Sequence, residues 1–197
     1  MTDLIKVMLV DDHAVVRAGY QMLLKNTPEI AVIAEADNGE EAYQLYSAHS
    51  PDVVVMDLSL PGIGGIEVTK RIISRDHKAK ILVFSMHEET IFVEQALQAG
   101  ASGYITKSSD PQLLVEAIKK LSNGEKYIDP ELAQQIAIEK SRGQDSPLSD
   151  FSAREFEIFC MLAEGLNTSE VAKKLSLSYK TVANYSTQIK TKLDIFF

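Results

Sequence analysis

The chain has 197 residues, 45% of them hydrophobic, a formal net charge of −8 and a single cysteine. This length allows one or two domains, and no apolar run approaches the roughly 18 residues of a membrane span. The N-terminus lacks a basic segment followed by an apolar one, and the lone Cys160 cannot form an internal disulfide. These features predict a cytoplasmic protein without a membrane partner. The acidity argues against general nucleic-acid binding, although residues 176–197, with three lysines and one aspartate, leave it open.

The first 121 residues alternate between short apolar runs and helical patterns. The predicted strands are 5–10, 31–36, 53–57, 80–85 and 102–106, and the predicted helices are 14–25, 39–48, 65–75, 88–98 and 111–121. Such an alternation requires parallel pairing with right-handed crossovers. Helices on both faces would explain why the third and fourth strands are apolar throughout. The pattern predicts an α/β fold with a doubly wound parallel sheet.

Polar side chains gather at the ends of four of these strands. Asp11 and Asp12 follow the first strand, Asp57 ends the third, Ser85 ends the fourth and Lys107 follows the fifth. The carboxyl ends of parallel strands meet in the crevice where open α/β sheets place their ligands. Three carboxylates suit Mg²⁺, one of them can attack phosphorus, and the hydroxyl and ammonium can contact a phosphoryl group. Taken singly, the aspartates could cap a helix and the lysine could be a solvated charge. Their joint placement favours a site.

The chain changes character after Gly124. Residues 126–147 read as a linker with a possible short helix at 130–139, because residues 141–147 are polar and rich in helix breakers. Three helices follow, at about 153–164, 168–175 and 179–193, and the first starts with a capping box of Ser152 and Glu155. Two helices joined by a short turn form a helix-turn-helix. We therefore expect a first domain at 1–125, a linker at 126–147 and a small all-α domain at 148–197.

Four segments resemble the receiver domain of two-component response regulators, over about residues 4–123. They are Leu9-Val10-Asp11-Asp12-His13, Val55-Met56-Asp57-Leu58-Ser59-Leu60-Pro61-Gly62, Phe84-Ser85 and Gly100-Ala101-Ser102-Gly103-Tyr104-Ile105-Thr106-Lys107. The resemblance implies a flavodoxin-like sheet of order 2-1-3-4-5.

The same resemblance implies a role for each polar residue. Asp57 would be the phosphoacceptor, Asp12, Asp57 and the Ser59 carbonyl would be Mg²⁺ ligands, and Asp11 would support them from a second shell. Lys107 and Ser85 would contact the phosphoryl group, and Tyr104 would turn inward when Ser85 moves. These are expectations for the structure.

Residues of about 148–195 resemble the LuxR-type helix-turn-helix, through Phe151-Ser152-Ala153-Arg154-Glu155, Leu162-Ala163-Glu164-Gly165, Glu170-Val171-Ala172, Leu175-Ser176-Leu177-Ser178, Lys180-Thr181-Val182 and Lys192-Leu193. With the receiver, the chain resembles a response regulator of the NarL/FixJ class. The family normally has a fourth helix after the recognition helix, and we expect the chain to lack it.

On the predicted recognition helix, some side chains would face base edges and others phosphates. Asn184 can pair with adenine and Ala183 can touch a thymine methyl group. The expected DNA contacts are Ser178, Lys180, Thr181, Ala183, Asn184, Thr187 and Lys190.

The resulting hypothesis is a transcriptional regulator. A sensor histidine kinase or a small phosphodonor would phosphorylate Asp57 with Mg²⁺, which would control homodimerisation and binding to promoter DNA. The chain would be no enzyme beyond phosphoryl transfer to its own aspartate and slow self-dephosphorylation. An aspartyl-phosphate phosphohydrolase would need a second aspartate two residues after the nucleophile, where Ser59 stands. A signalling module that acts through protein partners rather than DNA is the remaining alternative.

Overall fold

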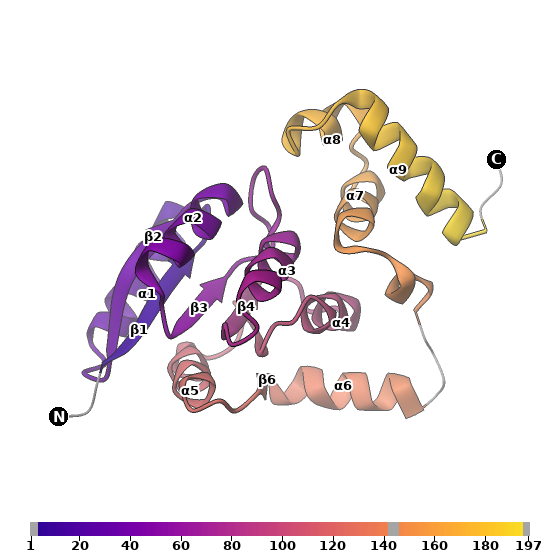
Figure 1. The fold of residues 1–197 in the computed structure, drawn as a ribbon. Helices are drawn as coiled ribbons and strands as arrows, with labels where there is room; N and C mark the ends of the chain where they lie inside the picture. Colours follow the sequence, from indigo (N-terminus) through magenta and orange to yellow (C-terminus); the bar gives the residue numbers. More distant parts are fainter. Residues whose placement is uncertain (1–3, 142–145, 195–197) are drawn as a thin grey trace. The chain divides into compact units, whose positions relative to one another are not determined.

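The computed structural model describes residues 4–141 and 146–194 (Figure 1). The chain divides into two compact units, residues 1–137 and 138–197, and each is described by itself. We expected the first domain to end at residue 125, so the first unit takes in twelve residues that we had given to the linker. Of the polar, breaker-rich residues 141–147 of that linker, residues 142–145 lie outside the described residues.

The first unit is built on a six-stranded parallel sheet of order β2-β1-β3-β4-β5-β6. The strands are β1 (Ile5–Val10), β2 (Ile30–Ala36), β3 (Val53–Met56), β4 (Ile81–Ser85), β5 (Gly103–Thr106) and β6 (Tyr127–Ile128). The predicted fold class and the order 2-1-3-4-5 are confirmed. Strand β6 was not predicted, because two residues are too few to show a periodic pattern. It joins the edge through bonds from the Tyr127 amide to the Ser102 carbonyl (3.2 Å) and from the Asp129 amide to the Tyr104 carbonyl (2.9 Å).

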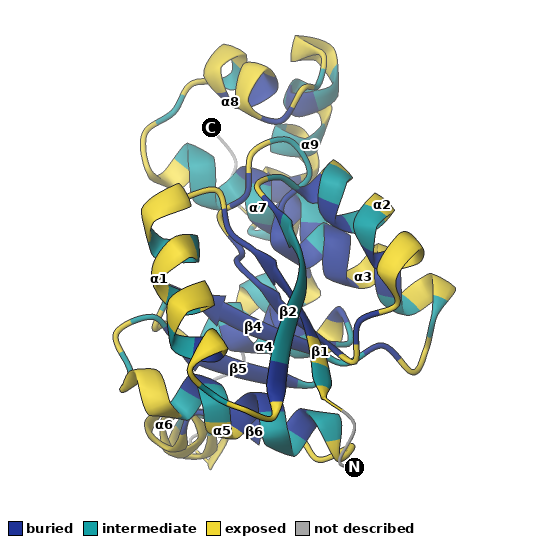
Figure 2. Cartoon of the chain, turned by 90° about the vertical axis from the view of Figure 1, so that its left-hand side faces the viewer, coloured by how far each residue is buried: buried dark blue, intermediate teal, exposed yellow. Residues whose placement is uncertain are grey.

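Helices cover both faces of this sheet, and the central strands β3, β4 and β5 are buried throughout (Figure 2). They are α1 (Ala14–Lys25), α2 (Gly39–His49), α3 (Gly65–Arg75), α4 (Thr90–Gln98) and α5 (Pro111–Ser122). Side chains of a strand alternate between faces. Thus Val7 and Leu9 of β1 join α1 and α5 in one apolar cluster, whereas Met8 and Val10 join α2 and α3 in another. The two clusters fix the sheet edge from which the polar residues project.

Local sequence signals set where these helices begin. Asp110 caps α5 by accepting a hydrogen bond from the Gln112 amide (2.8 Å), with Pro111 at the first helical position. Asn38 caps α2 in the same way through the Glu41 amide (2.9 Å). The short helix expected within the linker is present as α6 (Pro130–Ser141). Because these caps fix where the helices begin, the loops that lead from strand to helix stay at the carboxyl edge of the sheet.

The second unit is all-helical over the residues that the structure describes. A 3-10 turn, η1 (Pro147–Asp150), precedes α7 (Ala153–Ala163), α8 (Thr168–Lys174) and α9 (Tyr179–Lys192). The predicted capping box is present, with the Ser152 amide donating to Glu155 Oε2 (2.7 Å) and the Glu155 amide donating to Ser152 Oγ (3.3 Å). Val182 and Ile189 of α9 are buried, which turns the opposite face of this helix outward. Residues 195–197, on which the expected lack of a fourth helix bears, lie outside the described residues.

Candidate phosphoryl-acceptor site and DNA-binding face

Parallel pairing brings the predicted acidic residues to one edge of the sheet. Val10 is paired with Met56, and the Asp57 amide donates to the Val10 carbonyl (2.9 Å), so the residues that follow β1 and β3 are neighbours. Asp11 and Asp57 are both buried, with 5% and 3% of their surface exposed. Burying two carboxylates in this way is costly unless a cation accompanies them.

The ammonium of Lys107 is that cation in this structure. Its Nζ lies 2.7 Å from Asp11 Oδ2 and 2.8 Å from Asp57 Oδ2, and the lysine side chain is only 6% exposed. The Lys107 amide donates to the Ser85 carbonyl (2.8 Å), which anchors this loop to β4. The structure therefore brings three of the predicted residues into direct contact.

Burial and charge act against one another on this pair. Burial raises the pKa of Asp57, more strongly than the Lys107 ammonium lowers it, and the neighbouring Asp11 charge raises it further. Burial disfavours the Lys107 ammonium, but attraction to Asp57 and Asp11 outweighs it, so the pKa of Lys107 is raised. Asp57 Oδ1 also accepts a hydrogen bond from the Leu58 amide (2.7 Å). The carboxylate is thus held in one orientation, with Oδ2 directed toward the lysine.

Asp12 lies at the open side of the same edge. Its Oδ1 is 2.8 Å from His13 Nδ1, and its side chain is 32% exposed. One ligand atom from each of Asp11, Asp12, His13 and Asp57 lies within 4.8 Å of the others. Carboxylate oxygens grouped in this way are the hard donors that Mg²⁺ prefers. The residues present therefore fit the metal that we expected.

The two predicted switch residues lie behind this cluster. Ser85 is completely buried, and its Oγ accepts a hydrogen bond from the His87 amide (3.3 Å). Tyr104 is also completely buried, with its hydroxyl donating to the His87 carbonyl (2.8 Å). Burial raises the pKa of Tyr104, and a hydrogen bond with Ser85 opposes the rise. Tyr104 is therefore turned inward and joined to Ser85 here.

Two residues that the sequence analysis did not single out lie in this region. His87 contacts both switch residues through its backbone, and its Nε2 lies 3.3 Å from Ser59 Oγ. Arg17 of α1 donates from Nη1 to the Asp11 carbonyl and from Nε to Glu35 Oε2 (3.2 Å). The position of His87, only two residues after Ser85, was a signal that could have indicated its place in the site. Arg17 lies within an amphipathic helix, and nothing in the sequence around it indicated a contact with the site.

The predicted DNA contacts lie on α9 and at its start. Lys180, Asn184, Thr187 and Lys190 are exposed, and Ala183 is half-buried. Helical periodicity places these residues on one side of α9, away from Val182 and Ile189.

The hydroxyl groups of this region also serve the helix itself. Ser178 Oγ caps α9 by accepting from the Thr181 amide (3.1 Å), and the two hydroxyl oxygens lie 2.7 Å apart. Thr187 Oγ1 donates to the Ala183 carbonyl (3.1 Å). Lys180, Asn184 and Lys190 therefore carry the long polar side chains of this outward face.

No helix in the ranges 4–141 and 146–194 is long and apolar enough to cross a membrane.

Comparison with known proteins identifies a family for each of the two units. Residues 7–119 match the family described as "Response regulator receiver domain", and residues 149–195 match "Bacterial regulatory proteins, luxR family". The chain is 39% identical to "Response regulator UvrY" of Escherichia coli (strain K12) over 194 residues, which are 98% of this chain and 89% of UvrY.

Two solved structures extend this likeness. A two-component response regulator of the LuxR family from Aurantimonas sp. SI85-9A1 is 50% identical, with a TM-score of 0.69 over 71% of this chain and 99% of that chain. RcsB from Salmonella enterica serovar Typhimurium, bound to promoter P1flhDC in the presence of phosphomimetic BeF3-, is 25% identical, with a TM-score of 0.74 over 99% of this chain and 95% of that chain. The chain therefore belongs to the two-component response regulators of the NarL/FixJ class, transcription regulators that join a receiver domain to a LuxR-type DNA-binding domain.

Proposed function

We propose that Asp57 is the phosphoryl acceptor of this regulator, and that its phosphorylation controls pairing of the chain and binding of α9 to promoter DNA. The donor is a sensor histidine kinase or a small phosphodonor. The observation that carries the proposal is the contact of one buried ammonium, Lys107 Nζ, with both Asp57 (2.8 Å) and Asp11 (2.7 Å). A buried carboxylate with a cation at hydrogen-bond distance is suited to receive a group that brings further negative charge.

The chemistry at Asp57 is a single displacement. A carboxylate oxygen of Asp57 forms a bond to phosphorus while the bond from phosphorus to the donor's leaving atom breaks, which gives an acyl phosphate. Lys107 then pairs with a phosphoryl oxygen, and the Ser85 hydroxyl donates to another. Tyr104, joined to Ser85 and to the His87 carbonyl, carries the change to the loop that follows β4. The chain does no other chemistry than this transfer and the slow hydrolysis of its product.

Mg²⁺ fits the acidic edge beside Asp57. Asp12, Asp57 and the Ser59 carbonyl would hold it, and Asp11 would support it from the second shell. When bound, the ion neutralises charge on the carboxylates and on the incoming phosphoryl oxygens. Asp11 and Asp12 supply the negative charge that attracts it, and their grouping with Asp57 within 4.8 Å supports this assignment.

Replacing Asp57 tests the acceptor directly. Asp57→Asn should abolish acid-labile labelling by a small phosphodonor, because the amide is not a nucleophile toward phosphorus at neutral pH. Asp52→Asn is the matched control, since Asp52 lies at the other end of β3, where its carboxylate accepts a hydrogen bond from the Lys6 amide (2.8 Å). Intact-mass measurement should show one added phosphoryl group in the wild type and in the control. Equal labelling of Asp57→Asn would contradict the proposal.

The second half of the proposal assigns promoter DNA to the outward face of α9. Lys180, Lys190, Ser178 and Thr181 are the phosphate contacts, and Ala183, Asn184 and Thr187 face the base edges. The exposure of Lys180, Asn184 and Lys190 supports this assignment. The solved promoter complex of a related regulator, with its phosphomimetic, also supports a DNA-bound output. Since DNA is the target, we infer that the protein acts in the cytoplasm.

Two variants separate phosphate contact from base reading. Lys180→Ala should weaken binding to every DNA sequence alike and flatten the salt dependence, because one phosphate contact is lost. Asn184→Ala should instead cost roughly 1–3 kcal/mol at one base position only. Binding by a panel of single-base operator variants, at several salt concentrations, distinguishes these results. A protein without salt-dependent DNA binding would favour an output through protein partners.

A further inference from the structure

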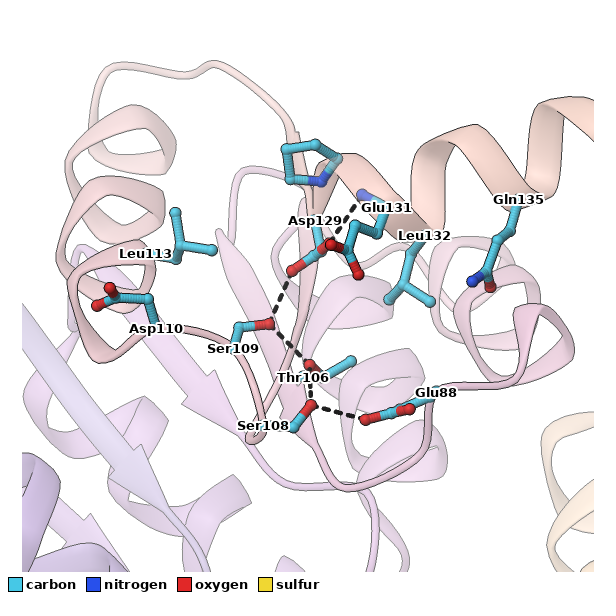
Figure 3. A pocket seen from close by; sticks show the side chains of 11 residues that line it. Glu88, Thr106, Ser108, Ser109, Asp110, Leu113, Asp129, Glu131, Leu132 and Gln135 are labelled. Carbon is cyan, nitrogen blue, oxygen red and sulfur yellow. Dashed lines mark hydrogen bonds between the residues drawn. The ribbon is translucent and has the colours of Figure 1, made fainter.

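A polar hollow lies beside the loop that carries Lys107, within the first unit. It has a volume of about 460 Å³ and is lined by the β4–α4 loop, the β5–α5 loop and the start of α6. Carboxylates and hydroxyls of Glu88, Thr106, Ser108, Ser109 and Asp129 meet along its wall (Figure 3). The side chains form a chain of hydrogen bonds rather than a set of separate solvated groups.

This chain of hydrogen bonds runs from Glu88 to Asp129 through the hydroxyls of Ser108, Thr106 and Ser109. Ser108 Oγ donates to Glu88 Oε1 (2.6 Å), and Ser109 Oγ donates to Asp129 Oδ2 (2.7 Å). Thr106 Oγ1 lies between them, 2.8 Å from Ser108 Oγ and 2.7 Å from Ser109 Oγ. Figure 3 shows these four contacts as dashed lines.

The hydroxyl protons of this hydrogen-bonded chain can be arranged in two ways. A hydroxyl has one proton to donate. Ser108 and Ser109 donate theirs to the carboxylates, so Thr106 is the donor in its contacts with them. With a single proton, Thr106 can donate to Ser108 or to Ser109, but not to both. Neighbouring hydrogen bonds polarise one another, so the choice strengthens one half of the chain and weakens the other.

The middle of this hydrogen-bonded chain is tied to the proposed phosphorylation site. Thr106 and Ser108 are the neighbours of Lys107 in the sequence, and the Ser109 amide donates to the Thr106 carbonyl (3.2 Å). The Lys107 ammonium contacts Asp11 and Asp57. When Lys107 turns from these carboxylates to a phosphoryl oxygen, the short loop around it must adjust.

The Asp129 end of the hydrogen-bonded chain holds the first turn of α6. Asp129 is 6% exposed, and its Oδ1 accepts from the Glu131 amide (2.9 Å). Its carbonyl accepts from the Ala133 amide (2.9 Å), and its own amide donates to the Tyr104 carbonyl (2.9 Å). Asp129 therefore links β5, the β5–α5 loop and the start of the helix that leads out of the sheet.

We propose that Ser109 and Asp129 are positioning residues that join the Lys107 loop to the first turn of α6. A movement of Lys107 on phosphorylation of Asp57 moves Thr106, changes the hydrogen bond between Thr106 and Ser109, and alters the hold of Asp129 on α6. This coupling rests on the proposed phosphorylation of Asp57. It is a second path by which phosphorylation changes the structure, beside the path through Ser85 and Tyr104. The second path leads into α6, the segment that connects the two units.

The test compares two serine variants that differ only in which half of the chain they cut. Ser109→Ala removes the link to Asp129 and leaves the α6 cap intact, whereas Ser108→Ala removes the equivalent hydroxyl on the Glu88 side. Amide hydrogen exchange of Glu131, Leu132 and Ala133 is measured with and without beryllofluoride and Mg²⁺. Binding of beryllofluoride is verified by fluorine NMR on the same samples.

In the wild type we expect the exchange rates of these amides to change by roughly two- to tenfold, the range to which one net hydrogen bond corresponds. Ser108→Ala should respond in the same way, and Ser109→Ala should bind beryllofluoride without any change in α6. Ser109→Thr, which restores a hydroxyl, should recover the response, whereas a merely structural role would not predict this recovery.

Each other outcome overturns the inference. If Ser109→Ala responds as the wild type does, the link through Ser109 is absent. If the wild type binds beryllofluoride but α6 does not respond, the coupling fails while the phosphorylation site stands. If the wild type neither binds beryllofluoride nor accepts a phosphoryl group, the proposed function fails and the coupling fails with it.

Discussion

The carboxyl edge of the sheet and the outward face of α9 carry polar residues in opposite ways. At the edge, the side chains of Asp57, Asp11 and Lys107 are almost completely buried, and Lys107 contacts both aspartates. On α9, Lys180 and Asn184 are exposed to solvent. Buried charges must satisfy each other, so their geometry is fixed before any ligand arrives. Exposed side chains keep their rotamer freedom and acquire a fixed geometry only on the ligand. We therefore expect substitutions at the edge to alter both stability and chemistry, and substitutions on the face to alter binding alone.

The largest effect that would test this comparison is expected at Gly65, the first residue of α3. A Cβ atom there would lie 2.0 Å from the Asp57 carbonyl oxygen and 2.8 Å from Leu58 Cα, both backbone atoms that cannot swing away. Gly65→Ala should lower the free energy of unfolding by about 3 kcal/mol or more. It should also displace the Asp57 backbone and abolish labelling by a small phosphodonor.

Gly19 in the middle of α1 provides the matched control. A Cβ atom there would meet nothing within 4 Å. Gly19→Ala should stabilise the protein by about 0.5–1 kcal/mol, because glycine loses more backbone entropy in a helix. Urea unfolding and phosphodonor labelling of both variants check the prediction. Normal labelling by Gly65→Ala, with a stability within about 1 kcal/mol of the wild type, would show that overpacking at this edge is relieved by movement of α3.

The same contrast explains what the sequence could predict. Apolar runs such as Val53–Met56 are long enough to show a buried strand, and parallel order then brings Asp11, Asp57 and Lys107 to one edge. Because these residues follow buried strands, few other positions are open to them. The sequence pattern was therefore sufficient to predict that they meet at one edge of the sheet. Strand β6 has two residues and leaves no periodic signal, which is why the sequence analysis assigned residues 126–137 to the linker.

Residues that act through contacts distant in the sequence were missed. Arg17 reaches both the Asp11 carbonyl and Glu35, but at its position in α1 an arginine is equally compatible with solvent. Ser109 and Asp129 are 20 residues apart and belong to a loop and to what we took for a linker. No local pattern pairs such residues, because the pairing depends on how β6 joins the sheet.

A second prediction concerns the pH dependence of labelling at Asp57. Attack on phosphorus requires the carboxylate, and burial raises the pKa of Asp57 despite the opposing Lys107 ammonium. The labelling rate should therefore fall about tenfold per pH unit below this pKa, and the fall should begin at a higher pH than the ordinary aspartate value of about 3.9. The raised pKa of Lys107 keeps the ammonium charged through neutral pH, so no matching loss is expected there.

Initial labelling rates with a small phosphodonor, measured at two Mg²⁺ concentrations, test this dependence. A bound cation favours the carboxylate, so more Mg²⁺ should move the fall in rate toward lower pH. A labelling rate that stays constant down to about pH 4 would mean that Asp57 behaves as an exposed aspartate.

The smallest predicted effect lies within α9, where Lys190 and Lys192 are two residues apart but differ in surroundings. Lys190 is exposed, whereas Lys192 Nζ donates to Glu155 Oε2 (2.7 Å) and to the Asp150 carbonyl (2.9 Å). Burial raises the pKa of Glu155, but the hydrogen bonds from Lys192 and Ser152 outweigh it, so this pKa is lowered. One lysine therefore ties α9 to the start of α7, and the other faces outward.

Lys192→Met should lower the stability of the second unit by about 1 kcal/mol, a value reduced because the lysine side chain is 38% exposed and its charge is screened. Lys190→Met should change it by less than about 0.5 kcal/mol but should weaken DNA binding and reduce the salt slope. Because the folded pKa of Glu155 is lowered, its contribution to stability is complete above the unfolded value of about 4.3 and is lost as the pH falls through the folded value. The difference between Lys192→Met and the wild type should therefore shrink in acid, whereas that of Lys190→Met should not. Amide hydrogen exchange of α7 and α9 at two pH values measures the stability change caused by each variant. Equal destabilisation by the two variants would contradict the distinction between a structural and an outward-facing lysine.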